Sequence, residues 1–260
     1  MQDSDHFPGQ DVCEGATQNI RTLVYHRITD NLLIARENPR CVYESVFRRH
    51  LDLLDRWGFT TITFRDYRLF QQGNLHLPKK PVILTLEGGH ADTYRVAFPA
   101  LLESGSHAVV FALAGTPEAY TGRAADHPAS SQMSFDQLRE MSAEGMEIGS
   151  LSLTYPNLLS LPPARVREEI VRSKDNLERI LDAPVLTFSY PYGKVTDALK
   201  KTVAEARYAF ACCWSSGSLR FDADPLEIRR LTVRGGMGSF ELGLTVRAPQ
   251  VARALWGAGS

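Results

Sequence analysis

The sequence is poor in the residues that hold metals and disulfides. Four cysteines occur among 260 residues, at positions 13, 41, 212 and 213, and no two of them have the C-x-x-C spacing of a metal site. Adjacent cysteines rarely bond to each other, so we expect four reduced thiols in a cytoplasmic protein. A strand would place Cys212 and Cys213 on opposite faces.

The sequence also lacks a strong charge of either sign. Basic residues number 29 and acidic residues 30, the formal net charge is -1, and no block of Lys or Arg occurs. This balance argues against a nucleic acid or a membrane surface as partner. No stretch approaches the roughly 20 apolar residues of a membrane span, and residues 1–19 lack the pattern of a secretory signal.

What the sequence does contain is an alternation of strand and helix patterns. Hydrophobic residues make up 43% and charged residues 23%, as in an ordinary globular protein. Short apolar runs that alternate with helical periods imply a parallel sheet or barrel. We predict a flexible segment over 1–19, one α/β domain over 20–240 and a C-terminal tail over 241–260.

The patterns predict the following elements. Strands are expected over 22–25, 59–64, 81–86, 108–113, 146–153, 185–189, 208–213 and 228–233. Helices are expected over 43–57, 65–71, 93–104, 134–145, 162–181 and 195–206, with loops around Pro39 and over 115–132. In the third helix Val96, Leu101 and Leu102 should face inward, and Ser134 with Gln137 should form a capping box.

The stretch from Pro81 to Asp92, P-V-I-L-T-L-E-G-G-H-A-D, organises the chain. A buried strand ends there in Glu87 and two glycines. Such a loop offers a carboxylate beside a backbone that a ligand can approach closely. We therefore expect the candidate site at this strand end.

Several short motifs, in order, resemble the polysaccharide deacetylases, the NodB-homology or carbohydrate esterase family four. They are Y-H-R-I at 25–28, F-R-R-H-L-D-L-L from 47, A-D-x-Y from 91, M-S-F-D-Q-L-R-E-M from 133, G-M-E-I-G-S from 145, T-Y-P-N-L at 154–158 and S-Y-P-Y-G at 189–193. The resemblance runs from about Thr22 to Arg234. It implies a distorted, incomplete (β/α)7 barrel with a glycan groove across the strand ends.

The resemblance also implies a divalent metal site, usually zinc, which this sequence does not reproduce. The family loop T-F-D-D-G supplies a base and one metal ligand, and H-x-x-x-H-P supplies two histidines. The base position falls on Glu87, and the ligand positions fall on Gly88, Leu151 and Tyr155. Because catalytic zinc needs three donor side chains, we expect no metal cofactor and no metal-dependent deacetylation.

Other parts of the family site are matched. By resemblance, Arg230 would pair with and orient Glu87. His90 stands where the family commonly has an aromatic residue and is a second candidate for the base. The groove would be lined by residues at six further positions: His26, Asp92, Tyr155, Tyr190, Pro191 and Tyr192.

Structural roles remain open for the same residues. Glu87 could serve only as the ion-pair partner of Arg230, His90 as a solvated loop residue and His26 as a cap. Tyr155 could fill the volume left by an imidazole. Leu151 and Leu153 make their loop more apolar than in the family, which fits either packing or an apolar ligand.

Three functions follow as hypotheses. The first is a protein that binds an N-acetylated sugar, an intracellular precursor or a small glycoside, without deacetylating it. The second is a metal-independent hydrolase of a C–N bond, with Glu87 or His90 as base and His26 or Tyr155 as helper. The third is a non-catalytic subunit that contacts a protein partner through the loop over 151–155.

Overall fold

The computed structural model describes residues 19–115, 132–214, 216–249 and 251. Cys13, most of the predicted N-terminal segment and most of the predicted loop over 115–132 lie outside these ranges. The other three cysteines are buried free thiols. Within the described ranges, no helix combines the length and the apolar content needed to cross a bilayer.

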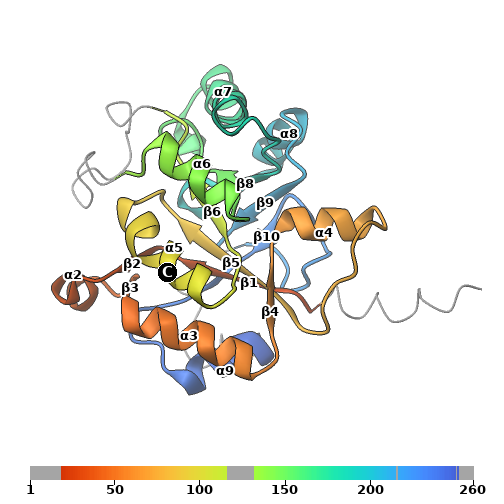
Figure 1. Ribbon diagram of the computed structural model, residues 1–260. Helices are drawn as coiled ribbons and strands as arrows, with labels where there is room; N and C mark the ends of the chain where they lie inside the picture. The colour runs from red at the N-terminus through yellow and green to blue at the C-terminus, as the bar shows by residue number, and fades with distance from the viewer. Residues whose placement is uncertain (1–18, 116–131, 215, 250, 252–260) are drawn as a thin grey trace, which may run out of the picture.

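Nine of the described strands form a parallel sheet that curls into a nearly closed barrel (Figure 1), and β2 and β3 pair separately. In spatial order they run β10-β9-β8-β7-β6-β5-β1-β11, and β4 also pairs with β5. Their bounds are β1 Arg21–Tyr25, β4 Thr60–Ile62, β5 Pro81–Glu87, β6 Val109–Ala112, β7 Glu147–Ser150, β8 Thr187–Ser189, β9 Phe210–Cys213, β10 Ile228–Arg229 and β11 Leu231–Thr232. The prediction of a distorted, incomplete barrel is confirmed.

The segment over 228–232 bridges most of the gap between β9 and β1 in the barrel. The sequence predicts a single strand over 228–233, but the structure breaks it at Arg230. Before the break, Ile228 and Arg229 pair with β9; after it, Leu231 and Thr232 pair with β1. The break lets one stretch of chain serve two strands that do not pair with each other.

Strand parity separates the barrel interior from its outer layer. Successive side chains of a strand point to opposite faces. Ile83, Val109, Phe111 and Phe210 therefore pack together inside, whereas their sequence neighbours face the helices. Cys212 belongs to the inner cluster and Cys213 to the outer one, as the alternation predicts.

Helices cover the outer layer on two sides. Figure 1 shows α6 Phe135–Ala143, α7 Pro163–Leu181 and α8 Asp197–Glu205 above the strands, with α3 Glu44–Arg56 and α9 Ser239–Arg247 below. The predicted capping box opens α6: Ser134 Oγ accepts from Gln137 N at 3.2 Å and Ser134 N donates to Gln137 Oε1 at 2.9 Å. The predicted tail from 241 begins inside α9, because Leu242 and Val246 are buried against the outer core.

Helix α4 Phe64–Gln71 closes the end of the barrel where the strands begin. Its Phe64 ring stacks on Phe210 at 5.3 Å between centroids. The predicted strand over 59–64 is shorter than expected, because Thr63 and Asp66 form a capping box that starts the helix at Phe64. The open end of the barrel is therefore the end where the strands finish.

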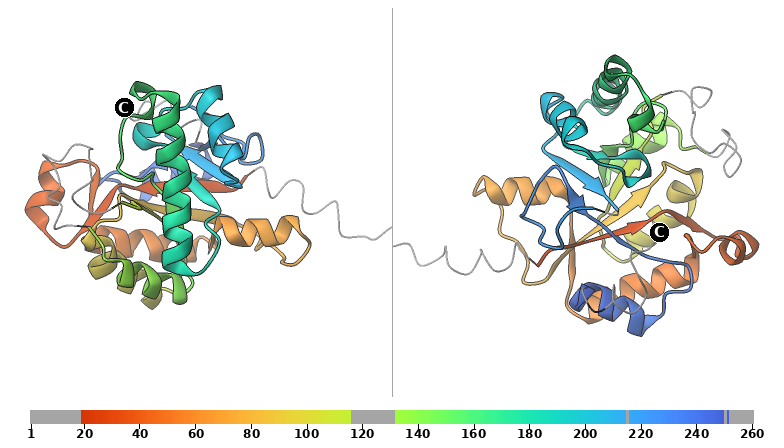
Figure 2. Two further views of the ribbon diagram at one scale, coloured as in Figure 1. Left: turned by 90° about the horizontal axis from the view of Figure 1, so that it is seen from above. Right: turned by 180° about the vertical axis from the view of Figure 1, so that it is seen from behind.

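Two further expectations differ from the structure. The predicted helix over 93–104 is a π-helical turn, η1 Thr93–Ala97, followed by α5 Phe98–Glu103, and Leu102 is 43% exposed. The expected loop around Pro39 contains β2 Arg27–Thr29, α2 Leu32–Glu37 and β3 Cys41–Tyr43. In Figure 2, α2 stands away from the barrel, at the opposite end from α4.

Candidate functional site

Glu87 and Arg230 face each other inside the barrel, at the carboxyl ends of the strands. Arg230 Nη2 lies 2.5 Å from Glu87 Oε2, and both side chains are buried, at 1% and 4% exposure. Ser189 Oγ joins them: it donates to Glu87 Oε2 at 3.2 Å and accepts from Arg230 Nη2 at 2.9 Å. The structure thus brings the two predicted residues together and adds a serine that the sequence did not single out.

Strand parity and the break at Arg230 create this cluster. Glu87 and Ser189 end β5 and β8 with their side chains inward, in step with Ile83 and Thr187. Arg230 N donates to Cys213 O at 3.0 Å, and the guanidinium lies 5.2 Å from the centre of the Phe111 ring. Since Phe188 faces the outer core, the alternation of side chains along β8 could have predicted that Ser189 faces the barrel interior.

The cluster retains unused hydrogen-bonding capacity. Glu87 Oε1 and Arg230 Nε and Nη1 are buried and have no hydrogen-bond partner in the described part of the chain. Leaving buried polar atoms unsatisfied costs about 1–3 kcal/mol each, and more when they are charged. A polar ligand that donates to the carboxylate and accepts from the guanidinium would relieve this cost.

His26 lies near the cluster, at the end of β1. Its ring meets Trp214 edge to face at 4.6 Å between centroids. Burial lowers the pKa of His26 to about 4; Glu87 raises it in part, and Arg230 and Arg40 lower it further. The imidazole is therefore neutral near pH 7, and no sequence pattern had pointed to Trp214.

His90 is buried, at 7% exposure, so the alternative of a solvated loop histidine is wrong. It pairs with Gln132 in an antiparallel bridge, and Met133 N donates to Gly89 O at 2.8 Å. A Cβ built on Gly88 would lie 2.5 Å from His90 Nε2, and Gly88 has a φ of +99°. The imidazole therefore fills the space that a side chain at position 88 would need.

The other two positions of the family metal site have packing roles. Leu151, at 1% exposure, belongs to the barrel interior. The Tyr155 ring packs on Tyr192 at 4.9 Å between centroids, and both residues have a φ of 60°. Tyr155 thus sits at a ring contact, in a backbone conformation rare for a non-glycine residue.

These residues do not fit a zinc ion. Gly88 has no donor atom, Leu151 is apolar, and a phenol is a poor ligand. Across the described ranges, no three His, Cys, Asp or Glu side chains gather closely enough to hold a metal. The donor set that a catalytic zinc requires is not supplied at the three matched positions.

Asp92 is held in an ion-pair network beside the site. Arg27 Nη2 lies 2.7 Å from Asp92 Oδ2, and Arg95 Nη2 lies 2.9 Å from Oδ1. Burial works to raise the pKa of Asp92, but hydrogen bonds from the two arginines outweigh it and lower the pKa. Asp92 thus fixes the loop after β5 against β2.

In the segment from 190 to 192, some side chains lie in the core and one lies at the site. Tyr190 is fully buried in the outer core and donates to Leu226 O at 2.9 Å, so its side chain does not line the groove that the resemblance implies. The parity that turns Ser189 inward turns Tyr190 toward the helices. Pro191 is also buried, whereas Tyr192 is half-buried and contacts Tyr155.

The sequence matches the profile of the family described as polysaccharide deacetylase over residues 74–211. The chain belongs to the polysaccharide deacetylase family. This family acts on acetylated polysaccharides, and its profile covers β5, β6, β7 and β8, whose ends carry Glu87, Gly88 and Leu151. The Bacillus subtilis protein YxkH is 23% identical over 226 residues, which cover 87% of this chain and 75% of that protein.

Solved structures of deacetylases share the fold. The deacetylase PplD of Streptococcus pyogenes superposes with a TM-score of 0.76 at 24% identity, over 88% of this chain and 98% of that one. A de-N-acetylase of Aggregatibacter actinomycetemcomitans gives 0.74 at 18% identity, over 84% and 96%. IcaB of Ammonifex degensii gives 0.69 at 23% identity, over 93% and 98%.

Proposed function

We propose that this member of the polysaccharide deacetylase family binds an N-acetylated sugar or a related glycan at the open end of its barrel and has lost metal-dependent deacetylation. The observation that carries the proposal is the position of His90. Its imidazole stands where the side chain of a metal ligand at position 88 would project.

The remaining polar groups support binding. Glu87 and Arg230 are charged, buried and only partly satisfied within the described residues, and they flank Ser189 at the strand ends. An acetamido group offers one N–H donor and one carbonyl acceptor, which complements a carboxylate beside a guanidinium. Nearby, Tyr155, Tyr192 and Trp214 offer aromatic rings.

Calorimetry combined with an acetate assay tests the proposal. N-acetylglucosamine oligomers should release heat on binding, and no acetate should form with added zinc, with added cobalt or with a chelator. Glu87→Gln should weaken binding by about tenfold, because the amide offers one acceptor oxygen in place of two. Glu241→Gln, at a half-buried position of α9, is the matched control and should bind as the wild type does.

Two results would contradict the proposal. Acetate release that a chelator abolishes would mean that other residues hold a metal, and the loss of the metal reaction would then be wrong. Absence of binding heat with every oligomer would remove the sugar-binding role.

A second candidate is metal-independent hydrolysis of an amide or related C–N bond. Glu87 Oε1, buried and without a hydrogen-bond partner in the described ranges, favours it, because a general base needs an uncommitted oxygen within reach of water. Chelator-resistant acetate release that Glu87→Gln abolishes would support this candidate. The same release with Glu87→Gln unchanged would exclude Glu87 as its base.

A further inference from the structure

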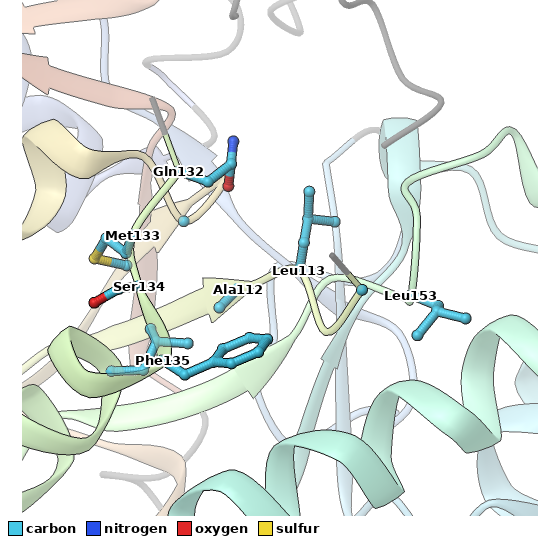
Figure 3. A pocket seen from close by; sticks show the side chains of 10 residues that line it. Ala112, Leu113, Gln132, Met133, Ser134, Phe135 and Leu153 are labelled. Atoms are coloured by element: carbon cyan, nitrogen blue, oxygen red, sulfur yellow. The ribbon is translucent and has the colours of Figure 1, made fainter. Parts of the chain in front are cut away.

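A second candidate site lies between the ends of strands β6 and β7 and the helices α6 and α7, and it does not include Glu87 or Arg230. Two neighbouring cavities, of about 220 and 410 Å³, share Gly115, Phe135 and Leu153 as lining residues. The smaller one lies at the start of α6 and the larger one extends along α7. Figure 3 shows the side chains that surround the smaller cavity.

The smaller cavity is mainly apolar, with Gln132 and Ser134 as its polar lining residues. In Figure 3, Leu113, Phe135 and Leu153 surround the open space, with Ala112 behind them. Phe135 is 38% exposed although it is a large aromatic residue. The two leucines of the loop after β7 therefore have different surroundings: Leu151 packs in the barrel interior, whereas Leu153 lines this cavity.

The larger cavity carries positive charge. Arg139, Arg172 and Arg179 line it together with Asn176, and among the described residues no acidic side chain lines it. Arg139 pairs with Asp136, and Arg172 Nη1 lies 2.6 Å from Glu168 Oε1. Arg179 donates to Asn176 Oδ1 at 3.2 Å.

The arginines retain the capacity to bind an anion. Arg139 and Arg172 have side chains that are 52% and 60% exposed, and exposed ion pairs of this kind contribute little free energy. A guanidinium has five N–H donors in a planar fork that suits a carboxylate or phosphate. An anionic head group can therefore be bound without breaking a buried contact.

We propose that the joined cavities bind an amphiphile with one apolar chain and an anionic carboxylate or phosphate head. The chain occupies the space between Leu113, Phe135 and Leu153, and the head contacts Arg172 and Arg179. The lining residues of the two cavities include neither Glu87 nor Arg230, and sugar binding is not required for this site.

Calorimetry with four probes, each below its micelle concentration, tests the site. Decyl phosphate and decanoate carry the same chain with two different anionic heads, decyl maltoside carries a neutral head, and inorganic phosphate has no chain. The two anionic amphiphiles should bind at least tenfold more tightly than decyl maltoside, and inorganic phosphate should release no heat. The ranking of decyl phosphate against decanoate identifies the preferred head.

Variants assign each end of the ligand. Arg172→Glu with Arg179→Glu should weaken decyl phosphate binding by at least tenfold. Arg167→Glu, on the same helix but not lining either cavity, is the matched control and should have no effect. Phe135→Asp places a carboxylate in the apolar end, at a helix position that favours acidic residues, and should abolish binding while the urea unfolding midpoint is retained.

The proposal is overturned if decyl maltoside binds as tightly as the anionic probes, or if the double arginine variant binds like the wild type. Absence of heat from all four probes also overturns it. The only sugar in these titrations is the maltose head of decyl maltoside, which has no N-acetyl group. Failure here therefore leaves the proposal of N-acetylated sugar binding standing, and the reverse also holds.

Discussion

At the scale of single residues, His90 and Gly88 carry the proposal that metal-dependent chemistry is lost. From the sequence alone, glycine at position 88 means that one of the family's metal ligands is replaced by a residue without a donor side chain. The structure adds a second obstacle, because the imidazole of His90 lies in the space beside the Gly88 Cα. Replacing the three ligand positions alone would therefore not rebuild a zinc site.

A gain-of-function series tests this reasoning. We expect that Gly88→Asp, Leu151→His and Tyr155→His together retain little zinc after dialysis, because the new carboxylate collides with His90. Adding His90→Ala should raise the zinc retained toward one ion per chain, as measured by atomic emission. His90→Ala alone is the control and should retain none. Full zinc retention by the triple variant would show that His90 does not block the position.

Glu169 links helix α7 to the loop after β7 at the scale of elements. It is 2% exposed, and its carboxylate accepts hydrogen bonds from Leu153 N at 3.0 Å, Thr154 N at 2.9 Å and Thr154 Oγ1 at 2.7 Å. The loop contains Ser152 and Tyr155 with positive φ. One side chain of α7 thus holds a strained loop in place and sets the position of Tyr155.

Glu169→Ala should destabilise the protein by about 3 kcal/mol, because it leaves two backbone N–H groups without their buried acceptor. Glu169→Gln keeps one acceptor oxygen and should cost about half as much. Urea unfolding measures both. Glu168→Ala, on the same helix, removes only surface ion pairs and should cost within about 1 kcal/mol. Equal costs for the alanine variants at 168 and 169 would contradict the anchoring role.

At the scale of the whole molecule, Glu147 links helix α4 to strands β7 and β8 of the barrel. It begins β7 inside the barrel, accepts from Arg65 N of α4 at 2.8 Å and from Thr187 Oγ1 of β8 at 3.0 Å, and is 3% exposed. Burial raises its pKa from 4.5 to about 7, against the lowering effect of these hydrogen bonds. The folded protein therefore holds a proton on Glu147 more tightly than the unfolded chain does.

The raised pKa of Glu147 determines in which direction the unfolding free energy changes with pH. The stabilisation from Glu147 protonation is full below about pH 4.5 and is lost as pH rises through about 7. Relative to Glu147→Gln, the wild type should lose roughly 3 kcal/mol of unfolding free energy across that interval. His26 has a lowered pKa, so its effect on stability has the opposite pH dependence. The quantity to measure is therefore the difference in unfolding free energy between the wild type and Glu147→Gln at each pH. A difference that stays constant with pH would be contrary to a proton held by Glu147.

The sequence by itself determined the parallel α/β barrel, most element positions and the family. The reason is that these follow from local rules: apolar alternation, the capping box at Ser134 and ordered motifs at the strand ends. Parity placed Cys212 and Cys213 on opposite faces, and applied to Ser189 and Tyr190 it would have corrected the groove assignment. The pairing of Glu87 with Arg230 came from the resemblance, and the structure brings the two residues into contact.

Only the tertiary structure decided where the chain departs from its local pattern. The break at Arg230 arises because one segment pairs with β9 on one side and β1 on the other, which no single-strand pattern encodes. The bridge of His90 with Gln132, the hydrogen bonds of Glu169 to the loop after β7 and the grouping of Arg139 with Arg172 and Arg179 each join residues from different elements. Such contacts depend on how the strands and helices pack, and a pattern read along the sequence cannot contain them.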